Sequence, residues 1–422
     1  MSEASIFILM IFIFIILTMV ARLPVGISLI IAAICGSLAG GAGLSWRHLV
    51  EGAFGYFDTI LIILTATIFM KTLEGSGALD SYVNFLLRAF YRWRPIFLLI
   101  LMFIVMFPGM ITGSSVTAIL SAGPLVAPVL LKLGLSRSRA AAFLAMGGIL
   151  GMIAPPVNIL LMIMGAGVDM PYVGITLPLL IIVLPLAVFA SLWLGLKESK
   201  KISQGELMSL LPVSCWPQYG WRLIVPLLAL IFFFIAPSLW PKIIPDLGLP
   251  ASFFVASLFG WLAGRPFSFF EATQKALEEA LPILSILIGV GMFTQIMTLT
   301  GSRGWLVVSI LSLPSLLLII GMMLSLPLFG GVSTFGSASI LGVPFILALI
   351  NLNALLTASA LSTFAAIGEL VPPAAFSARF AAQVMGERSL LSIQKNSAIP
   401  AILFWIMGLI LILLAPFLDK WI

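Results

Sequence analysis

The feature that most constrains this chain is a series of long apolar runs, each nearly free of charge. A membrane-spanning helix needs about 20 predominantly apolar residues. Runs of this kind lie at 4–20, 24–40, 56–73, 138–167, 172–196, 222–240, 249–264, 279–299, 352–384 and 398–418. The apolar residues are continuous rather than alternating, which excludes a membrane β-barrel. We therefore predict an all-α polytopic membrane protein with about ten transmembrane spans.

Composition excludes several other classes of protein. Only 9% of the 422 residues are charged and 62% are hydrophobic, whereas soluble domains carry about 25% charged residues. The chain is therefore neither an ordinary soluble enzyme nor a disordered segment. The single histidine, His48, and the two cysteines, Cys35 and Cys215, offer no histidine-built metal centre and no disulfide framework. We expect no enzymatic activity and no cofactor.

Two further apolar runs, 95–133 and 304–350, are each interrupted by a small polar cluster, and we interpret them as re-entrant helical hairpins. If these hairpins re-enter and the other ten runs cross, nearly all of the 21 basic residues fall on one face of the membrane. The exceptions are Arg47, Lys242, Arg303 and Lys420. Cytoplasmic loops are rich in Lys and Arg. We therefore predict that both termini lie outside, on the face opposite the cytoplasm.

The two halves of the chain share an ordered set of motifs, which indicates an internal repeat. The matches pair Leu23-Pro24 with Leu249-Pro250, Thr72–Ser76 with Thr298–Ser302, Gly151 with Gly368, and Pro155-Pro156 with Pro372-Pro373. Each half would hold five crossings and one hairpin, so the second half is predicted to be inverted in the membrane. Inverted repeats with helices broken near the midplane are typical of secondary transporters.

The repeat gives a domain organisation. The first inverted repeat, 1–196, would hold scaffold helices within 1–73, the hairpin 95–133 and the broken helix 138–167. A polar cytoplasmic linker is expected at 197–221. The second repeat, 222–422, would hold scaffold helices within 222–299, the hairpin 304–350 and the broken helix 352–384. Amphipathic stretches at 44–55 and 266–280 precede the third span of each half. They are predicted to be interfacial arms that brace the scaffold, with an ordinary connecting helix as the alternative.

Polar residues are concentrated at the hairpin turns and helix breaks. Thr112-Gly113-Ser114-Ser115 lies at the first turn, and Gly151 to Asn158 contains two prolines within an apolar span. Proline removes a backbone hydrogen bond, and unwound backbone at membrane depth is tolerated only where it is buried or lines a cavity. Carbonyl and hydroxyl oxygens suit a small cation, while half-helix N-termini suit an anionic group. The second half repeats this pattern from Gly330 to Ser337 and from Gly368 to Pro373.

These segments provide the candidate site residues. The candidate sodium sites, built largely from backbone carbonyls, comprise Ser114, Ser115, Gly151, Pro155, Ser333, Thr334, Gly368 and Glu369. The candidate substrate-binding residues are Thr112, Ser114, Ser115, Asn158, Ser333, Thr334 and Arg379. Small and hydroxylated residues are also common packing devices between membrane helices, so packing is the alternative for each of them.

Glu369 is the one acidic residue within a predicted helix break, and its counterpart in the first half is Met152. A charge at the bilayer centre costs at least ~2.5–3.5 kcal/mol. Glu369 is therefore predicted to bind a coupling ion or a proton, with a neutral glutamic acid bonded to backbone as the alternative. Arg379 could meet a substrate carboxylate or extend to the cytoplasmic face. Asn158 could orient a ligand or cap the following half-helix.

Over essentially its whole length, the chain resembles the large membrane subunit of tripartite ATP-independent periplasmic (TRAP) transporters, the dicarboxylate-permease type. The resemblance is strongest in the residues GSS at 113–115, in Gly134-Leu135 to Arg139-Ala140-Ala141-Ala142, and in LGMIAPP at 150–156. Val157 and Val371 stand where the family has Ser and Thr. The acidic residue that follows the second hairpin turn in the family is absent between Ser333 and Ser339. The chain is thus identified as a divergent member.

The resemblance implies an elevator mechanism, in which hairpins and broken helices slide against a scaffold. It also implies sodium coupling, a small membrane partner of about four helices, and a periplasmic binding protein that delivers an organic acid. The implied location is a bacterial inner membrane, with both termini of this chain in the periplasm. A stand-alone, ion-coupled organic-anion carrier without partners is the nearest alternative. An intramembrane enzyme and a channel are more distant ones, because the sequence offers neither an Asp pair nor a Ser–His pair at membrane depth, and hairpins in an inverted repeat favour alternating access.

Overall fold

The computed structural model describes residues 1–349 and 351–418, and within these residues every regular element is a helix. Position 350, at the end of the second predicted hairpin, and Lys420 lie outside the described residues. Within the described part of the chain, six helices are long and apolar enough to cross a membrane, or seven if the bent pair Trp46–Phe54 and Phe57–Gly75 is one span. The prediction of an all-α polytopic membrane protein is confirmed at this level, and the number of ten spans stays a prediction.

The first half of the chain forms ten helices. They are α1 (Glu3–Met19), α2 (Val25–Ala39), α3 (Trp46–Phe54), α4 (Phe57–Gly75), α5 (Ala78–Phe90), α6 (Arg94–Thr112), α7 (Ser115–Lys132), α8 (Arg137–Ile153), α9 (Ile159–Ala166) and α10 (Thr176–Gly195). Two short helices, α11 (Gln204–Leu210) and α12 (Trp216–Tyr219), occupy the polar linker. The apolar runs at 4–20, 24–40 and 56–73 thus form helices with nearly the expected bounds.

The second half contains α13 to α22 and three short turns of other helix types. They are η1 (Gly220–Ile224), α13 (Val225–Leu239), α14 (Gly248–Ala263), α15 (Phe269–Leu299), α16 (Ser302–Leu311), α17 (Ser315–Gly330), α18 (Thr334–Ser337), η2 (Ala338–Gly342), α19 (Val343–Ala348), α20 (Ala354–Ile367), η3 (Gly368–Leu370), α21 (Phe376–Met385) and α22 (Leu390–Leu418). The two predicted helix breaks separate α8 from α9 and α20 from α21.

The structure differs from the sequence prediction in the second hairpin. Helix α16 is a separate element that ends at Leu311, and the hairpin itself consists of α17 and the segment α18–η2–α19. Pro314 separates α16 from α17 because proline cannot continue a helix as a hydrogen-bond donor. Helix α5 is the corresponding separate element of the first half. Both α5 and α16 follow a glycine with positive φ, Gly77 or Gly301, which favours a chain reversal there.

The two amphipathic stretches also behave differently from one another. The first forms α3, which is bent by 43° from α4. The second is not a separate arm, because residues from Phe269 onward continue without interruption through the 31-residue helix α15. Pro282 is accommodated inside this helix. The long α15 therefore joins the second arm and the third span of its half into one rigid element.

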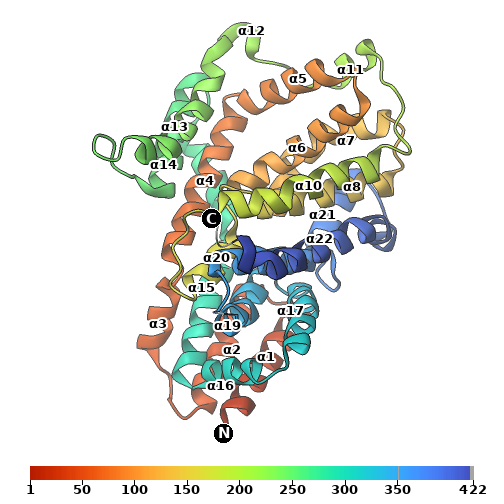
Figure 1. Ribbon diagram of the computed structural model, residues 1–422. Helices are drawn as coiled ribbons and strands as arrows, with labels where there is room; N and C mark the ends of the chain where they lie inside the picture. Colours follow the sequence, from red (N-terminus) through yellow and green to blue (C-terminus); the bar gives the residue numbers. More distant parts are fainter. Residues whose placement is uncertain (350, 419–422) are drawn as a thin grey trace.

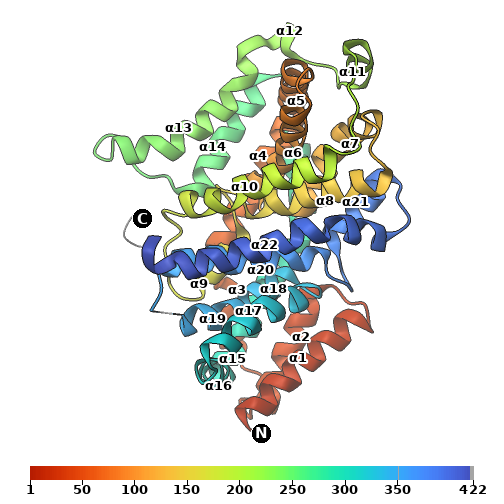
Figure 2. The same ribbon diagram turned by 45° about the vertical axis from the view of Figure 1, so that its right-hand side comes forward.

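The helices form two groups, which we call the column and the block. The column consists of α2, α3, α4, α14 and α15, which pack along one another on the left of Figure 1. The block consists of α6 to α10, α17 to α22 and the turns between them, stacked crosswise to the column (Figure 1, Figure 2). Close helix contacts hold the column together. A Cβ atom added to Gly291 of α15 would lie 2.0 Å from the carbonyl oxygen of Gly52 in α3.

Large apolar side chains also cover much of the outer surface. On α13, for example, Leu228, Ile231 and Phe232 are exposed, and only 22% of the apolar window that includes this helix is buried. A soluble monomer rarely exposes apolar patches of this extent, whereas lipid tails cover them in a bilayer. The surface therefore fits a multi-pass membrane protein.

Candidate functional site

The tip of the first hairpin is a tight turn between α6 and α7. Helix α6 ends at Thr112, and Gly113 follows with φ +64°. A side chain at Gly113 would also collide with Ile159, since an added Cβ would lie 2.5 Å from Ile159 Cγ1. Ser114 then caps α7, its hydroxyl accepting a hydrogen bond from the Thr117 amide at 3.2 Å. Glycine and serine at these positions therefore allow the chain to reverse and start a new helix within the protein.

The second hairpin has the same kind of tip. Helix α17 ends at Gly330, and the Ser333 hydroxyl accepts a hydrogen bond from the Gly336 amide at 3.1 Å. The helix that begins at Thr334 continues to Ala348 through one π-helical turn, η2. Such turns are frequent at functional sites. Both tips thus present the N-terminus of a capped helix.

Each tip lies against the helix break of its own half through matching contacts. The Val157 amide donates to the Met110 carbonyl at 3.2 Å, and the Ala374 amide donates to the Gly331 carbonyl at 2.9 Å. A glycine pair in each half allows the backbones to approach. A Cβ atom added to Gly109 would lie 3.0 Å from the Gly151 backbone, and one added to Gly330 would lie 3.0 Å from the Gly368 Cα. Turn and break therefore lie against each other in both halves.

Glu369 joins the two tips. Its carboxylate accepts hydrogen bonds from the hydroxyls of Ser115 at 3.0 Å, Thr334 at 2.9 Å and Ser377 at 3.0 Å. The residue is only 4% exposed, and none of the salt bridges found in the described part of the chain includes it. The partners of the carboxylate are therefore side-chain hydroxyls rather than a basic residue. A carboxylate held in this way is suited to bind a cation or a proton.

A cavity of about 220 Å³ opens beside Glu369. Both tips line it, and so does Met152, the first-half counterpart of Glu369. Part of its lining belongs to α15 of the column and includes Glu279. Phenylalanine side chains complete the lining, at positions Phe335, Phe376 and Phe380. A cavity of this size at the contact between column and block suits a small ligand.

A charged network continues from the cavity into the column. Glu279 pairs with Lys71 of α4 at 2.6 Å, and Lys71 also pairs with Glu74 at 2.9 Å. The other oxygen of Glu74 accepts a hydrogen bond from the Ser121 hydroxyl of α7 at 2.6 Å. The sequence prediction did not include these residues. The i, i+3 pair of Lys71 and Glu74 at the end of the apolar run 56–73 was the signal that could have identified them.

Three predicted substrate-binding residues lie outside the lining of this cavity. Thr112 is buried and its hydroxyl donates to the Pro108 carbonyl at 2.8 Å. Asn158 caps α9 and its side-chain amide donates to the Ser362 hydroxyl at 3.1 Å. Arg379 is exposed and donates to the Pro373 carbonyl at 2.5 Å. In contrast, Ser114, Ser115, Ser333 and Thr334 all line the cavity.

The donor set for a cation is made of hydroxyls and carbonyls. Among the residues that the structure describes, no group of three or more His, Cys, Asp or Glu side chains could hold a metal ion. Gly151 and Gly368 lie at the contact between tip and break, where Pro155 and the following residues are unwound. Of the candidate cation ligands, Ser115 and Thr334 are joined directly to the Glu369 carboxylate, which among the described residues contacts both tips.

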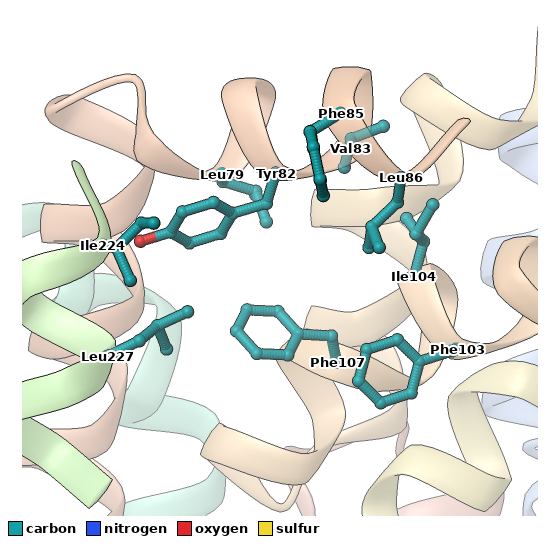
Figure 3. A pocket seen from close by; sticks show the side chains of 10 residues that line it. All are labelled: Leu79, Tyr82, Val83, Phe85, Leu86, Phe103, Ile104, Phe107, Ile224 and Leu227. Carbon is teal, nitrogen blue, oxygen red and sulfur yellow. The ribbon is translucent and has the colours of Figure 1, made fainter. Parts of the chain in front are cut away.

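A second cavity, of about 280 Å³, has a different chemistry. It lies between α5, α6 and η1–α13, and its lining side chains are almost wholly apolar (Figure 3). The Tyr82 hydroxyl is the polar group at its edge, and it donates to the Leu223 carbonyl. An apolar cavity of this kind offers nothing to hold a charged substrate. The cavity at the hairpin tips is therefore the candidate functional site.

Capped hairpin tips, paired helix breaks and a lipid-exposed apolar surface are typical of a membrane transporter. The chain matches the family model of the tripartite ATP-independent periplasmic transporter, DctM component, over residues 12–418. It therefore belongs to the DctM component family of TRAP transporters, and the resemblance inferred from the sequence is confirmed.

The fold of the chain is similar to that of a solved transporter. The crystal structure of the Alcanivorax borkumensis YdaH transporter, described as revealing an unusual topology, matches with a TM-score of 0.62 and 15% sequence identity. The match covers 88% of this chain and 89% of the YdaH chain. At this identity the similarity concerns the fold alone. No curated protein sequence matches the chain.

Proposed function

We propose that this chain is the permease subunit of a secondary active, sodium-coupled importer of small organic acids, located in a bacterial inner membrane. The observation that carries the proposal is the convergence of both hairpin tips on Glu369, beside a cavity that faces the column. This arrangement brings oxygen ligands for a cation and helix N-termini for an acid group into one place. The multi-pass architecture and the family membership support the same function.

The two ligands would use different parts of the site. Hard oxygen ligands from hydroxyls, carbonyls and Glu369 suit Na⁺. The first-turn backbone amides of α7 and of the helix Thr334–Ala348 have no hydrogen-bond acceptor within their own helix. The caps Ser114 and Ser333 each accept a hydrogen bond from one of these amides, and the others can bind a ligand. Such amides favour an anionic group. Sodium bound next to Glu369 would offset its charge and so make binding of an acid more favourable, which is the basis of coupling.

The mechanism we propose is an elevator movement of the block against the column. The tip-and-break hydrogen bonds are of the same kind in both halves and support an internal repeat, while the inversion of the second half rests on the predicted odd number of crossings in each half. Hydrogen bonds also cross between the groups: Ser121 contacts Glu74, and the Tyr56 hydroxyl lies 2.9 Å from the Ser339 hydroxyl. A few polar contacts between two internally well-packed groups are compatible with sliding.

The proposal includes two partners, a small four-helix membrane subunit and a periplasmic binding protein. Family membership in a tripartite transporter supports both. With both termini in the periplasm, the polar linker with α11 and α12 would face the cytoplasm, which agrees with its basic residues. The alternative is a stand-alone carrier that needs neither partner.

Uptake into liposomes tests the proposal. The chain is reconstituted with and without its membrane partner, and the binding protein is added outside with a panel of labelled acids such as succinate, gluconate and β-alanine. We expect uptake of at least one acid to require an inward sodium gradient and to stop when the gradient is dissipated. Equal uptake with potassium in place of sodium would disprove sodium coupling. Uptake without any partner would favour the stand-alone carrier.

A further inference from the structure

The acidic side chains of the cavity at the hairpin tips make it a poor site for a simple dicarboxylate, because like charges repel. Its lining includes two carboxylates, Glu279 and Glu369, and among the described residues that line it there is no Lys, Arg or His. Lys71 contacts Glu279 from the column but is shared with Glu74. One cation therefore faces two anions in that network, and Glu369 adds a further acidic group.

We propose that the substrate of this cavity is a small zwitterion, an organic acid that also carries an ammonium group, and that Glu279 recognises the positive charge. The inference rests on the proposed function, since it takes the cavity to be the substrate site. It specifies the chemical class of the substrate within the broad group of organic acids.

The hydrogen bonding of Glu279 supports this assignment. Its Oε2 atom lies 2.6 Å from the Lys71 ammonium. Its Oε1 atom is buried and has no hydrogen-bond partner within the described part of the chain. Buried polar atoms in proteins are nearly always paired, so an unpaired carboxylate oxygen in a cavity wall indicates a partner from the ligand. An ammonium group supplies that partner by donating an N–H hydrogen bond, whereas a quaternary amine would be held near the carboxylate by its charge alone.

The aromatic side chains of the cavity fit the same ligand. Phe335, Phe376 and Phe380 line it together with Glu279. A cation near the face of an aromatic ring is attracted by the ring quadrupole, and aromatic cages recognise quaternary ammonium ligands in this way. A second carboxylate of the ligand would instead lie near Glu279, where like charges repel. The cavity thus combines attraction for a cation with rejection of a dianion.

The acid end of the zwitterion would bind at the hairpin tips. The hydroxyls of Ser115 and Thr334 donate hydrogen bonds to Glu369 and are therefore already used. The remaining donors at the tips are the first-turn backbone amides of the two tip helices, and these would bind the ligand carboxylate. The tips and Glu279 belong to the block and the column, respectively. A zwitterion that bridges them would contact both groups at once.

The test compares ligands of equal shape that differ in charge. The full-length chain is purified in detergent with NaCl, and the midpoint of its thermal unfolding is followed as ligand is added. One ligand pair is glycine betaine and its carbon isostere 3,3-dimethylbutanoate. The other pair is β-alanine and its carbon isostere butanoate. We expect at least one zwitterion to raise the midpoint. The isostere that lacks its positive charge should bind with an at least tenfold lower affinity. Succinate serves as the dianion probe, and we expect it to be weaker still.

Variants of neighbouring glutamates locate the effect. Glu279→Gln is expected to lower the affinity for the zwitterion at least tenfold. Glu278→Gln makes the same charge change on the exposed neighbour and is expected to leave binding unchanged. An equal loss in both variants, or no loss in either, would overturn the role of Glu279. If Glu279→Gln does not fold, the comparison of isosteres in the wild-type chain still decides the substrate class.

The outcomes separate this inference from the proposed function. If succinate or the isosteres stabilise the chain and no zwitterion does, the inference is wrong but the chain can still be an importer of acids. Sodium-driven uptake of succinate without uptake of β-alanine would have the same meaning. If no member of the panel changes the midpoint, the inference is wrong as well. The absence of sodium-driven uptake for every acid would count against the proposed function, even if zwitterions stabilise the chain.

Discussion

Glu369 is the residue on which the candidate site depends most. Three hydroxyls from α7, from the start of α18 and from α21 donate to a single buried carboxylate. A buried acceptor that loses its negative charge leaves these donors with a weaker partner. The same carboxylate is therefore both a structural link between the hairpin tips and the best candidate ligand for the coupling ion.

Replacing Glu369 by glutamine should raise the sodium concentration needed for half-maximal uptake at least tenfold, because an amide oxygen is a poorer ligand for Na⁺ than a carboxylate. We expect the protein to fold with a loss of about 1–3 kcal/mol in stability. Sodium titration of uptake in liposomes measures the first effect. Glu387→Gln, on the exposed segment after α21, is the matched control. A sodium dependence identical to wild type would reduce Glu369 to a packing role.

The hydroxyls at the tips can be tested separately. Ser115→Ala combined with Thr334→Val removes two donors to Glu369 and should weaken sodium-dependent uptake severalfold without preventing membrane insertion. Thr363→Val is a suitable control, because the Thr363 hydroxyl is buried but bonds within its own helix to the Ser359 carbonyl at 3.0 Å. Unchanged sodium dependence in the double variant would contradict the assignment of the tips as a cation site.

At the scale of elements, close backbone contacts explain why several helices contain glycine. A Cβ atom on Gly291 would lie 2.0 Å from a backbone oxygen of α3, which cannot give way as a side chain can. Gly291→Ala should therefore force α3 from α15 and lower stability by about 1–3 kcal/mol. Gly321 in α17 has nothing within 4 Å of an added Cβ, so Gly321→Ala should be neutral or stabilising by up to about 1 kcal/mol. Thermal unfolding of the two variants compares them directly, and equal midpoints would disprove this packing.

The linker helix α11 is attached to the first hairpin by charge. Bonding to the Lys132 ammonium and to the Ser203 amide and hydroxyl lowers the pKa of Glu206 from 4.5 to about 2. A lowered pKa stabilises the folded form at pH values above about 4.5, and this contribution is lost as the pH falls toward 2. We expect amide hydrogen exchange in Gln204–Leu210, corrected for its intrinsic pH dependence, to accelerate below pH 4.5. Glu206→Gln should exchange fast at all pH values, and a wild type insensitive to acid would contradict the prediction.

For the whole molecule, the decisive question is whether the block moves against the column. Ser121 in the block and Glu74 in the column are joined by a 2.6 Å hydrogen bond. Cysteines at both positions, with Cys35 and Cys215 replaced by serine, should form a cross-link that stops uptake, and a reductant should restore it. A cysteine pair at Arg139 of α8 and Glu198, which follows α10 in the linker and forms a 2.9 Å ion pair with Arg139, does not join the block to the column and is the control that should leave uptake intact. Full activity of the cross-linked Glu74–Ser121 pair would contradict the elevator movement.

Several aspects of the fold could be predicted from the sequence because they depend on local chemistry. Long apolar runs indicated membrane helices, since a buried backbone must be satisfied within its own helix. The proline pairs at Pro155 and Pro372 marked the helix breaks, and Gly113 marked a turn, because these residues limit the backbone directly. The bounds of α16 and the continuity of α15 were not predicted. They depend on packing against neighbouring helices, which outweighs weak local signals.

The sequence by itself therefore determined that this protein is embedded in a membrane, where its helices break, and to which family it belongs. Only the tertiary structure decided which polar residues meet. Ser115 and Glu369 are separated by 254 positions and yet form a hydrogen bond, and Glu279 faces the same cavity from another helix. Thr112, Asn158 and Arg379 lie outside its lining, although they are close in sequence to residues inside it. Local preferences act over a few residues, whereas a site at the contact of two helix groups exists only once both have packed.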